Sequence, residues 1–199
     1  MSVTTRGRPR AFDRGEVLAK ALEAFWEHGF EATSVAGLTK AMGIGPPSLY
    51  AAFGDKKALF REAVAVYQRT HGAFAARALA EEPTARQGIA RMLHEAATQY
   101  TSPAHPRGCL IISAAVNCTP DSADIEQHLR DERNANVADL ERRIQSDVDS
   151  GTLPAGTNAR ALAVFTAATL QGMSQQARDG ASREDLEAVA ASSMLAWPG

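Results

Sequence analysis

The side chains best able to bind a polyanion are three alternating arginines near the N-terminus, Arg6, Arg8 and Arg10. A glycine and a proline stand between them and oppose helix formation. We therefore expect a flexible, extended basic arm over residues 1–11. Such arms bind in narrow, A·T-rich minor grooves, where the negative potential of DNA is greatest. The alternative is a solvated terminus without a partner.

The charges of the chain are divided unequally along its 199 residues. Residues 1–60 contain eight lysines or arginines and six aspartates or glutamates, for a charge of +2. The remaining 139 residues contain 13 and 17, for a charge of −4, which gives the whole chain its net −2. This division favours a basic end that meets a polyanion and an acidic remainder that does not.

A second candidate for DNA binding lies at residues 34–53, which read S-V-A-G-L-T-K-A-M-G-I-G-P-P-S-L-Y-A-A-F. The pattern predicts one short helix from Ser34 to a stop at Gly43, and another beginning near Pro46. Two short helices joined by a tight turn form a helix-turn-helix, whose second helix can enter a major groove. A plain helical hairpin within a bundle is the alternative.

The second of these helices has an unusual composition for a helix that reads bases. Residues 46–53 contain no Arg, Lys, Asn or Gln, so bidentate hydrogen bonds to base edges are not available from it. Base contacts must then come from the Ser48 hydroxyl, from Tyr50, and from apolar contact of Pro46, Pro47 or Ala51 with thymine methyl groups. We infer that the N-terminal arginines supply a larger share of the affinity.

Residues 8–60 resemble the TetR/AcrR family of one-component bacterial regulators, over about a quarter of the chain. The matching elements are the Arg-Pro-Arg arm, Phe25, Gly29 and Phe30, Thr33-Ser34-Val35, Gly43-Ile44, Ser48-Leu49-Tyr50, Phe53 and Lys56-Lys57-Ala58-Leu59-Phe60. Two positions depart from the common pattern, because Gly45 replaces a serine and Ala51 replaces a frequent histidine.

The resemblance implies roles for particular residues. Thr33 or Ser34 and Lys56 would bind backbone phosphate, while Ser48 and Tyr50 would reach bases and phosphate. Phosphate contacts fix the register, and base contacts give the sequence preference. The complete set of expected DNA-binding residues is Arg6, Arg8, Arg10, Thr33, Ser34, Gly45, Pro46, Pro47, Ser48, Tyr50 and Lys56.

The positions of apolar residues, caps and glycines predict an all-α fold of about nine helices. Gly29 closes the first helix, Asp121 starts a long polar one, and Thr157 caps the penultimate one. We expect a three-helix helix-turn-helix domain at residues 12–60, joined to a helical ligand-binding and dimerisation bundle at residues 61–199.

The family resemblance also implies how two copies would associate. The last two helices, expected at Thr157–Gly180 and Ser182–Ala196, would pair with their copies in a four-helix interface. A dimer is needed physically, because one short recognition helix buries too little surface for useful specificity. The alternative is that these helices pack only within the monomer.

An effector bound between the middle helices would occupy an apolar pocket with a few polar groups. The candidate lining residues are Met92, Tyr100, Cys109, Ile112, Phe165, Thr169 and Met173. Each of them is also a plausible ordinary core residue. Cys109 beside two apolar residues is typical of a buried small hydrophobe, although a thiol- or metal-responsive regulator acting through Cys109 is the alternative.

Enzymatic and metal sites are not indicated. The five histidines show no ligand spacing with one another or with cysteine, and no glycine-rich loop follows a strand. Cys109 and Cys118, if they shared one helix, would project about 180° apart. We therefore expect no catalytic residue, no metal and no cofactor.

No apolar run is long enough for a membrane span, and no apolar segment follows the N-terminal arginines as in a secretory signal. The sequence thus predicts a cytoplasmic, ligand-responsive transcriptional regulator without a membrane partner. In this prediction a homodimeric repressor is released from a pseudo-palindromic, double-stranded operator by a small molecule. The alternatives are a transcriptional activator, an architectural DNA-binding protein and a helical adaptor.

Overall fold

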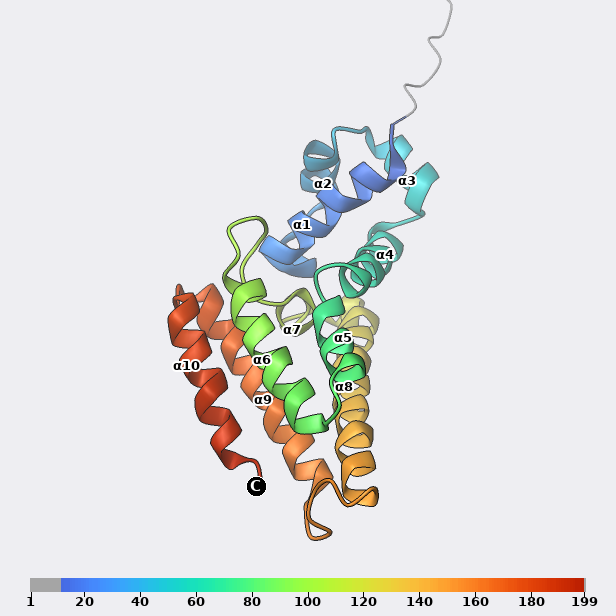
Figure 1. Cartoon of the computed structure of the whole chain (residues 1–199). Coiled ribbons are helices and arrows are strands. Elements are labelled where there is room, and N and C mark those ends of the chain that lie inside the picture. Colours follow the sequence, from blue (N-terminus) through green and yellow to red (C-terminus); the bar gives the residue numbers. More distant parts are fainter. Residues whose placement is uncertain (1–11, 199) are drawn as a thin grey trace, which may run out of the picture.

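The computed structural model describes residues 12–198, so the expected basic arm with Arg6, Arg8 and Arg10 lies outside the described residues. The described residues form helices and turns without any strand, which confirms the all-α expectation. A small N-terminal group of helices sits at one end of a longer C-terminal bundle (Figure 1).

The N-terminal helices are α1 (Arg14–Ala32), α2 (Val35–Met42), α3 (Pro46–Phe53) and α4 (Lys56–Arg69). α1 packs against α2 and α4. Their shared core is aromatic, with the Phe60 ring 5.0 Å from Phe25 and 5.1 Å from Phe30 between ring centroids. Edge-to-face aromatic pairs of this kind add to the stabilisation from burial. This core fixes the platform from which α2 and α3 project.

Gly29 interrupts α1 near its end, as the sequence predicts. Its φ of 78° lies in the left-handed region that favours glycine, and residues 30–32 form only a short turn beyond it. The Phe30 N–H donates instead to the carbonyl of Ala114 in the C-terminal part, at 2.7 Å. A Cβ at position 29 would lie 3.2 Å from that oxygen, so both conformation and space favour glycine there.

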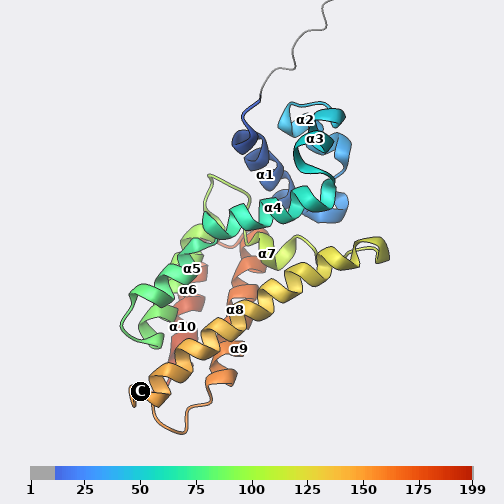
Figure 2. The ribbon, with the colours of Figure 1, turned by 90° about the vertical axis from the view of Figure 1, so that its right-hand side faces the viewer.

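The C-terminal part is a bundle in which α8 packs along α9, and α6 packs against α5, α9 and α10. Figure 2 shows α8 as the long diagonal helix that reaches from the N-terminal part to the far end of the bundle. The elements of the C-terminal part are α5 (Ala73–Glu81), α6 (Ala85–Thr101), the single-turn α7 (Leu110–Ser113), α8 (Ala123–Asp149), α9 (Ala159–Arg178) and α10 (Arg183–Ser193), with 3-10 turns at Pro120–Ser122 and Met194–Ala196.

Three boundaries differ from the sequence expectation. The long helix α8 begins at Ala123 after a 3-10 turn that contains Asp121. α9 is capped by Asn158 rather than Thr157, because the Asn158 side chain accepts from the Ala161 N–H at 2.9 Å. The expected domain boundary between residues 60 and 61 falls inside α4, which is shared by both parts.

Within residues 12–198, none of the helices combines the length and the apolar character that crossing a bilayer requires.

Candidate nucleic-acid interface and ligand cavity

The turn between α2 and α3 is built by its glycines. Gly43 ends α2 in the left-handed conformation, with φ 69°, and Gly45 precedes α3 in extended conformation. Pro46 and Pro47 then occupy the first turn of α3, where a missing N–H costs no helical hydrogen bond. Ser34 opens α2, since its hydroxyl accepts from the Gly37 N–H at 3.0 Å. The predicted helix-turn-helix is therefore present.

α3 has one buried face and one exposed face. Leu49 and Phe53 are buried in the core, whereas Tyr50 is 50% exposed. Ser48 is half-buried, and the two prolines at the start of the helix are exposed. Arg14 braces the end of α3 by donating to the Ala52 carbonyl at 3.2 Å. The surface of α3 thus offers hydroxyl groups and apolar atoms for base contact.

The expected phosphate-binding residues lie in different environments. Ser34 is exposed at the start of α2, where backbone N–H groups also favour an anion. Thr33 is buried, and its hydroxyl donates to the Gly29 carbonyl at 2.6 Å, so that it stabilises the end of α1. The Lys56 amine lies 4.1 Å from the centre of the Phe30 ring, and burial lowers its pKa.

The lysines next to these positions were not among the expected residues. Lys40 is exposed in the last turn of α2, three residues before Gly43. Lys57 is engaged elsewhere, since its amine bonds the Asp124 carboxylate and the Asp121 carbonyl, each at 2.6 Å. The ion pair of Lys57 joins residues far apart in the chain and carries no local sequence signal. Lys40, by contrast, could have been named as a candidate for phosphate contact from its position in the helix-turn-helix.

A cavity of about 270 Å³ lies among α4 to α9, and it brings together four of the seven expected effector residues. Those four lining residues are Met92, Tyr100, Cys109 and Ile112. The other three, Phe165, Thr169 and Met173, line a shallow groove between α9 and α10 on the outside of the bundle. The sequence could not separate these sets, because both faces of α9 carry apolar residues.

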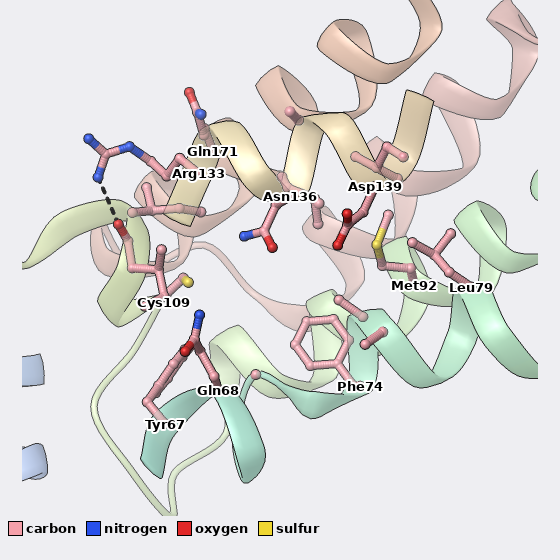
Figure 3. A pocket seen from close by; sticks show the side chains of 18 of the residues that line it. Tyr67, Gln68, Phe74, Leu79, Met92, Cys109, Arg133, Asn136, Asp139 and Gln171 are labelled. Atoms are coloured by element: carbon pink, nitrogen blue, oxygen red, sulfur yellow. Dashed lines mark hydrogen bonds between the residues drawn. The ribbon is translucent and has the colours of Figure 1, made fainter. Parts of the chain in front are cut away.

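Several cavity residues were missed by the sequence reasoning (Figure 3). They include the polar side chains of Gln68 from α4, Asn136 and Asp139 from α8, and Gln171 from α9. Asn136 and Leu140 lie one helical turn apart and both line the cavity. This spacing is present in the sequence, but a polar side chain on a long polar helix gives no sign that it lines a cavity.

Cys109 lies in the cavity wall in a setting that disfavours its thiolate. Burial raises the pKa of the Cys109 thiol, and burial likewise raises the pKa values of Tyr67 and Tyr100, which flank it. A reactive cysteine requires the opposite shift, since the thiolate is the nucleophile. The thiol-responsive alternative is therefore not favoured.

Cys109 and Cys118 form neither a disulfide nor a shared metal site among the described residues. In the chain, Cys109 directly precedes the single-turn helix α7 and Cys118 follows it, so the two do not share one long helix, and both are free thiols within residues 12–198. No cluster of three potential metal ligands is found among these described residues.

One helix connects the two candidate sites. Lys56 begins α4 beside the helix-turn-helix, and Tyr67 and Gln68 near its other end line the cavity. The eleven residue steps from Lys56 to Tyr67 correspond to about 17 Å along a helix. A ligand that moves the cavity end of α4 would also move the end that faces DNA.

A helix-turn-helix joined to a helical bundle with a partly open cavity is the architecture of a DNA-binding protein with a ligand-binding domain. The chain belongs to the tetR family of bacterial regulatory proteins, whose sequence model matches residues 17–63, and a tetracyclin repressor-like C-terminal domain matches residues 85–192. It is a DNA-binding transcriptional regulator, which confirms the resemblance found in residues 8–60.

Individual relatives resemble the chain over nearly its whole length. It is 37% identical to the HTH-type transcriptional repressor ComR of Escherichia coli (strain K12) over 198 residues, which are 98% of this chain and 93% of that protein. It is 31% identical to the repressor BdcR of the same organism over 93% of this chain and 89% of that one. The solved structure of a cysteine-substituted CifR with 26-base-pair double-stranded operator DNA has a TM-score of 0.92 and 44% identity, and the match covers 96% of this chain and 100% of that chain.

Proposed function

We propose that the protein is a homodimeric repressor that a small molecule releases from a pseudo-palindromic operator. The observation that carries this proposal is the path of α4, which begins at the helix-turn-helix and ends in the cavity wall. An effector shifts such an equilibrium only by its difference in affinity for the two states. The relatives ComR and BdcR are named repressors, and CifR has been solved on operator DNA.

The homodimer forms through the last two helices, α9 and α10. Their outer face carries Phe165 and Val189, each at least 40% exposed, in the lining of the shallow groove described above. Exposed apolar side chains gathered on one face favour a protein partner. A second copy of this chain is the occupant that gives two recognition helices, one turn of DNA or a multiple of it apart.

We assign Phe165, Thr169 and Met173 to this dimer face rather than to the effector. The effector is then held in the cavity by Met92, Tyr100, Cys109 and Ile112, together with polar groups such as Gln68, Asn136 and Gln171. The cavity admits a small, mostly apolar molecule whose polar groups can bond amide and hydroxyl side chains.

Operator contact uses the exposed face of α3 together with the starts of α2 and α4. Ser48 and Tyr50 contact bases, Ser34 and Lys56 contact phosphate, and Thr33 acts indirectly by fixing the end of α1. The N-terminal arginines add minor-groove contacts. Gly45, Pro46 and Pro47 shape the approach of α3 to the groove.

The protein acts on cytoplasmic DNA as a regulator and not as an enzyme. The relatives support this, because they are named as transcriptional regulators.

The sign of regulation is tested with a reporter. The region upstream of the gene is fused to a reporter in a host that lacks the protein, and expression is measured with and without the protein supplied in trans. Repression lowers the reporter signal, and Tyr50→Ala restores it. A rise in signal would contradict the proposal and identify an activator.

A further inference from the structure

Hydrogen bonds join the carboxyl end of α1 to the C-terminal part. In one of them α1 donates, and in two others its carbonyl groups accept. Because Gly29 leaves the helical conformation, the Phe30 N–H donates to the Ala114 carbonyl at 2.7 Å. In an uninterrupted helix it would bind the carbonyl of Trp26, four residues earlier. The interruption therefore leaves carbonyl groups at the end of α1 that need other donors.

Arg178, the last residue of α9, supplies those donors. Its Nη1 donates to the Trp26 carbonyl at 3.3 Å, and its Nη2 donates to the Glu27 carbonyl at 3.2 Å. A positive charge at a helix C-terminus also complements the helix dipole. The planar guanidinium can serve both carbonyls at once, which the compact ammonium of lysine does with less geometric precision.

The stem of Arg178 is held by the loop that precedes α7. A Cβ at Gly108 would lie 3.0 Å from the Arg178 Cγ and 2.8 Å from the Ser174 carbonyl oxygen, so the loop packs directly on α9. From the same loop, Arg107 donates to the carbonyl of Ala181, just beyond α9. The end of α1, this loop and the end of α9 thus form one junction.

A second junction joins the two parts without involving α9. Lys57 and Arg61 of α4 both bind the Asp124 carboxylate of α8, at 2.6 Å each. α8 does not belong to the proposed dimer face. The Arg178 hydrogen bonds therefore connect the DNA-binding part directly to a helix that would pair with its copy.

We propose that Arg178 is a positioning residue that sets the operator half-site spacing recognised by the dimer. This inference rests on the dimeric function proposed above. Pairing of α9 and α10 fixes α9 relative to its copy, and Arg178 fixes α1 relative to α9. Because α1 packs against α2 and α4, which flank α3, the clamp sets the separation and angle of the two recognition helices.

The test uses one operator in a series of duplexes with zero, one or two base pairs added or removed at its centre. Each base pair moves a half-site by about 3.4 Å and rotates it by about 34°. Affinities of full-length wild type, Arg178→Ala and Arg178→Lys are measured by fluorescence anisotropy. A duplex with one half-site, the dimer mass and the melting temperature are measured alongside.

The matched control is Arg160→Ala. Arg160 lies in the first turn of α9 and pairs with Glu141 of α8, at the opposite end of the helix from α1. We expect wild type and this control to prefer the best spacing by about tenfold, a typical size for coupling between sites. Arg178→Ala should reduce that ratio to about threefold or less while half-site affinity is unchanged, and Arg178→Lys should fall between them.

Two results would overturn the inference. If Arg178→Ala retains the wild-type spacing ratio, or loses affinity equally for all duplexes and for the half-site, Arg178 does not set spacing. In both cases the dimeric function stands. If wild type itself is monomeric or shows no spacing preference, the proposed dimeric function fails and this inference fails with it.

Discussion

The DNA-facing end of the molecule is assembled from neighbouring residues, whereas the cavity is assembled from distant ones. α2, α3 and the start of α4 form one continuous stretch whose turns are set by glycines and caps. The cavity takes its walls from six helices between α4 and α9. Local chemistry therefore specifies the helix-turn-helix, while tertiary packing specifies the cavity that we propose holds the effector.

The two ends also differ in how their polar groups are used. Tyr50 is half exposed on α3, while Tyr67 and Tyr100 are buried with raised pKa values. The Tyr50 side chain is open to solvent, whereas both tyrosines of the cavity wall are buried. The amide side chains of Gln68, Asn136 and Gln171 in the same wall are exposed. Substitutions at the first end should change DNA affinity with little cost in stability, and substitutions at the second should change the response to effector.

The largest expected effect comes from filling the cavity. Ala75 of α5 is half-buried in the cavity wall, whereas Ala80 of the same helix is exposed and outside it. Ala75→Trp should abolish release from the operator by a compound that releases wild type, with operator affinity changed by no more than about twofold. Ala80→Trp is the control and should respond like wild type. Full release of Ala75→Trp at the same compound concentration would place the effector elsewhere.

Removing the basic arm should have the next largest effect, and it separates electrostatic affinity from base reading. The slope of log affinity against log salt is negative. Replacing Arg6, Arg8 and Arg10 together by alanine should make it less steep by about 2.7, or about 0.9 for each phosphate contact. That corresponds to about a hundredfold weaker binding at 0.15 M salt. An unchanged slope would remove the arm from the interface.

Tyr50 tests the exposed face of α3. Tyr50→Ala should weaken operator binding by about tenfold, because apolar and hydrogen-bonding contact to the major groove is lost. Its melting temperature should stay near that of wild type, since the side chain is 50% exposed. Tyr50→Phe separates the ring from the hydroxyl. Equal affinity of wild type and Tyr50→Ala on the operator would show that α3 reads bases through other groups.

The smallest effect concerns pH at the contact between the two parts. Hydrogen bonds from Ser122 and Thr119 lower the pKa of Glu31 from its usual 4.5. A carboxylate with a lowered folded-state pKa contributes stability above its unfolded pKa and loses it as the pH falls through the folded value. Thermal melts from pH 6 to pH 3 should therefore show a shallower loss of stability below about 4.5 for Glu31→Gln than for wild type. Parallel curves of melting temperature against pH for the two proteins would show that protonation of Glu31 does not change the stability.

Much of the DNA-binding end could be predicted because its signals are local. Ser34, Gly43 and Gly45 act within a few residues of their positions, so their types nearly determine the backbone there. The fold class followed from the spacing of apolar residues together with the caps and glycines. Details that depend on competition between adjacent caps, such as Asn158 in place of Thr157, were wrong by one residue.

The cavity was only half predictable, for a physical reason. Met92 and Tyr100 lie on the buried face of α6. The sequence predicts that this face is buried, but it does not show whether a side chain there packs against another helix or against an empty cavity. Gln68 and Gln171 line the cavity through tertiary packing that no local pattern encodes. The ion pair of Lys57 with Asp124 spans 67 residues and was likewise invisible in the sequence.

The most direct measurement is a fluorescence-anisotropy titration of purified full-length protein onto the labelled duplex upstream of its own gene. A scrambled duplex of equal length is the control, at two salt concentrations, because affinity without a stated salt concentration is uninterpretable. We predict a clear preference for the upstream duplex at both concentrations, with two chains bound per site. Equal binding to both duplexes, or one chain per site, would contradict a dimeric, sequence-specific regulator.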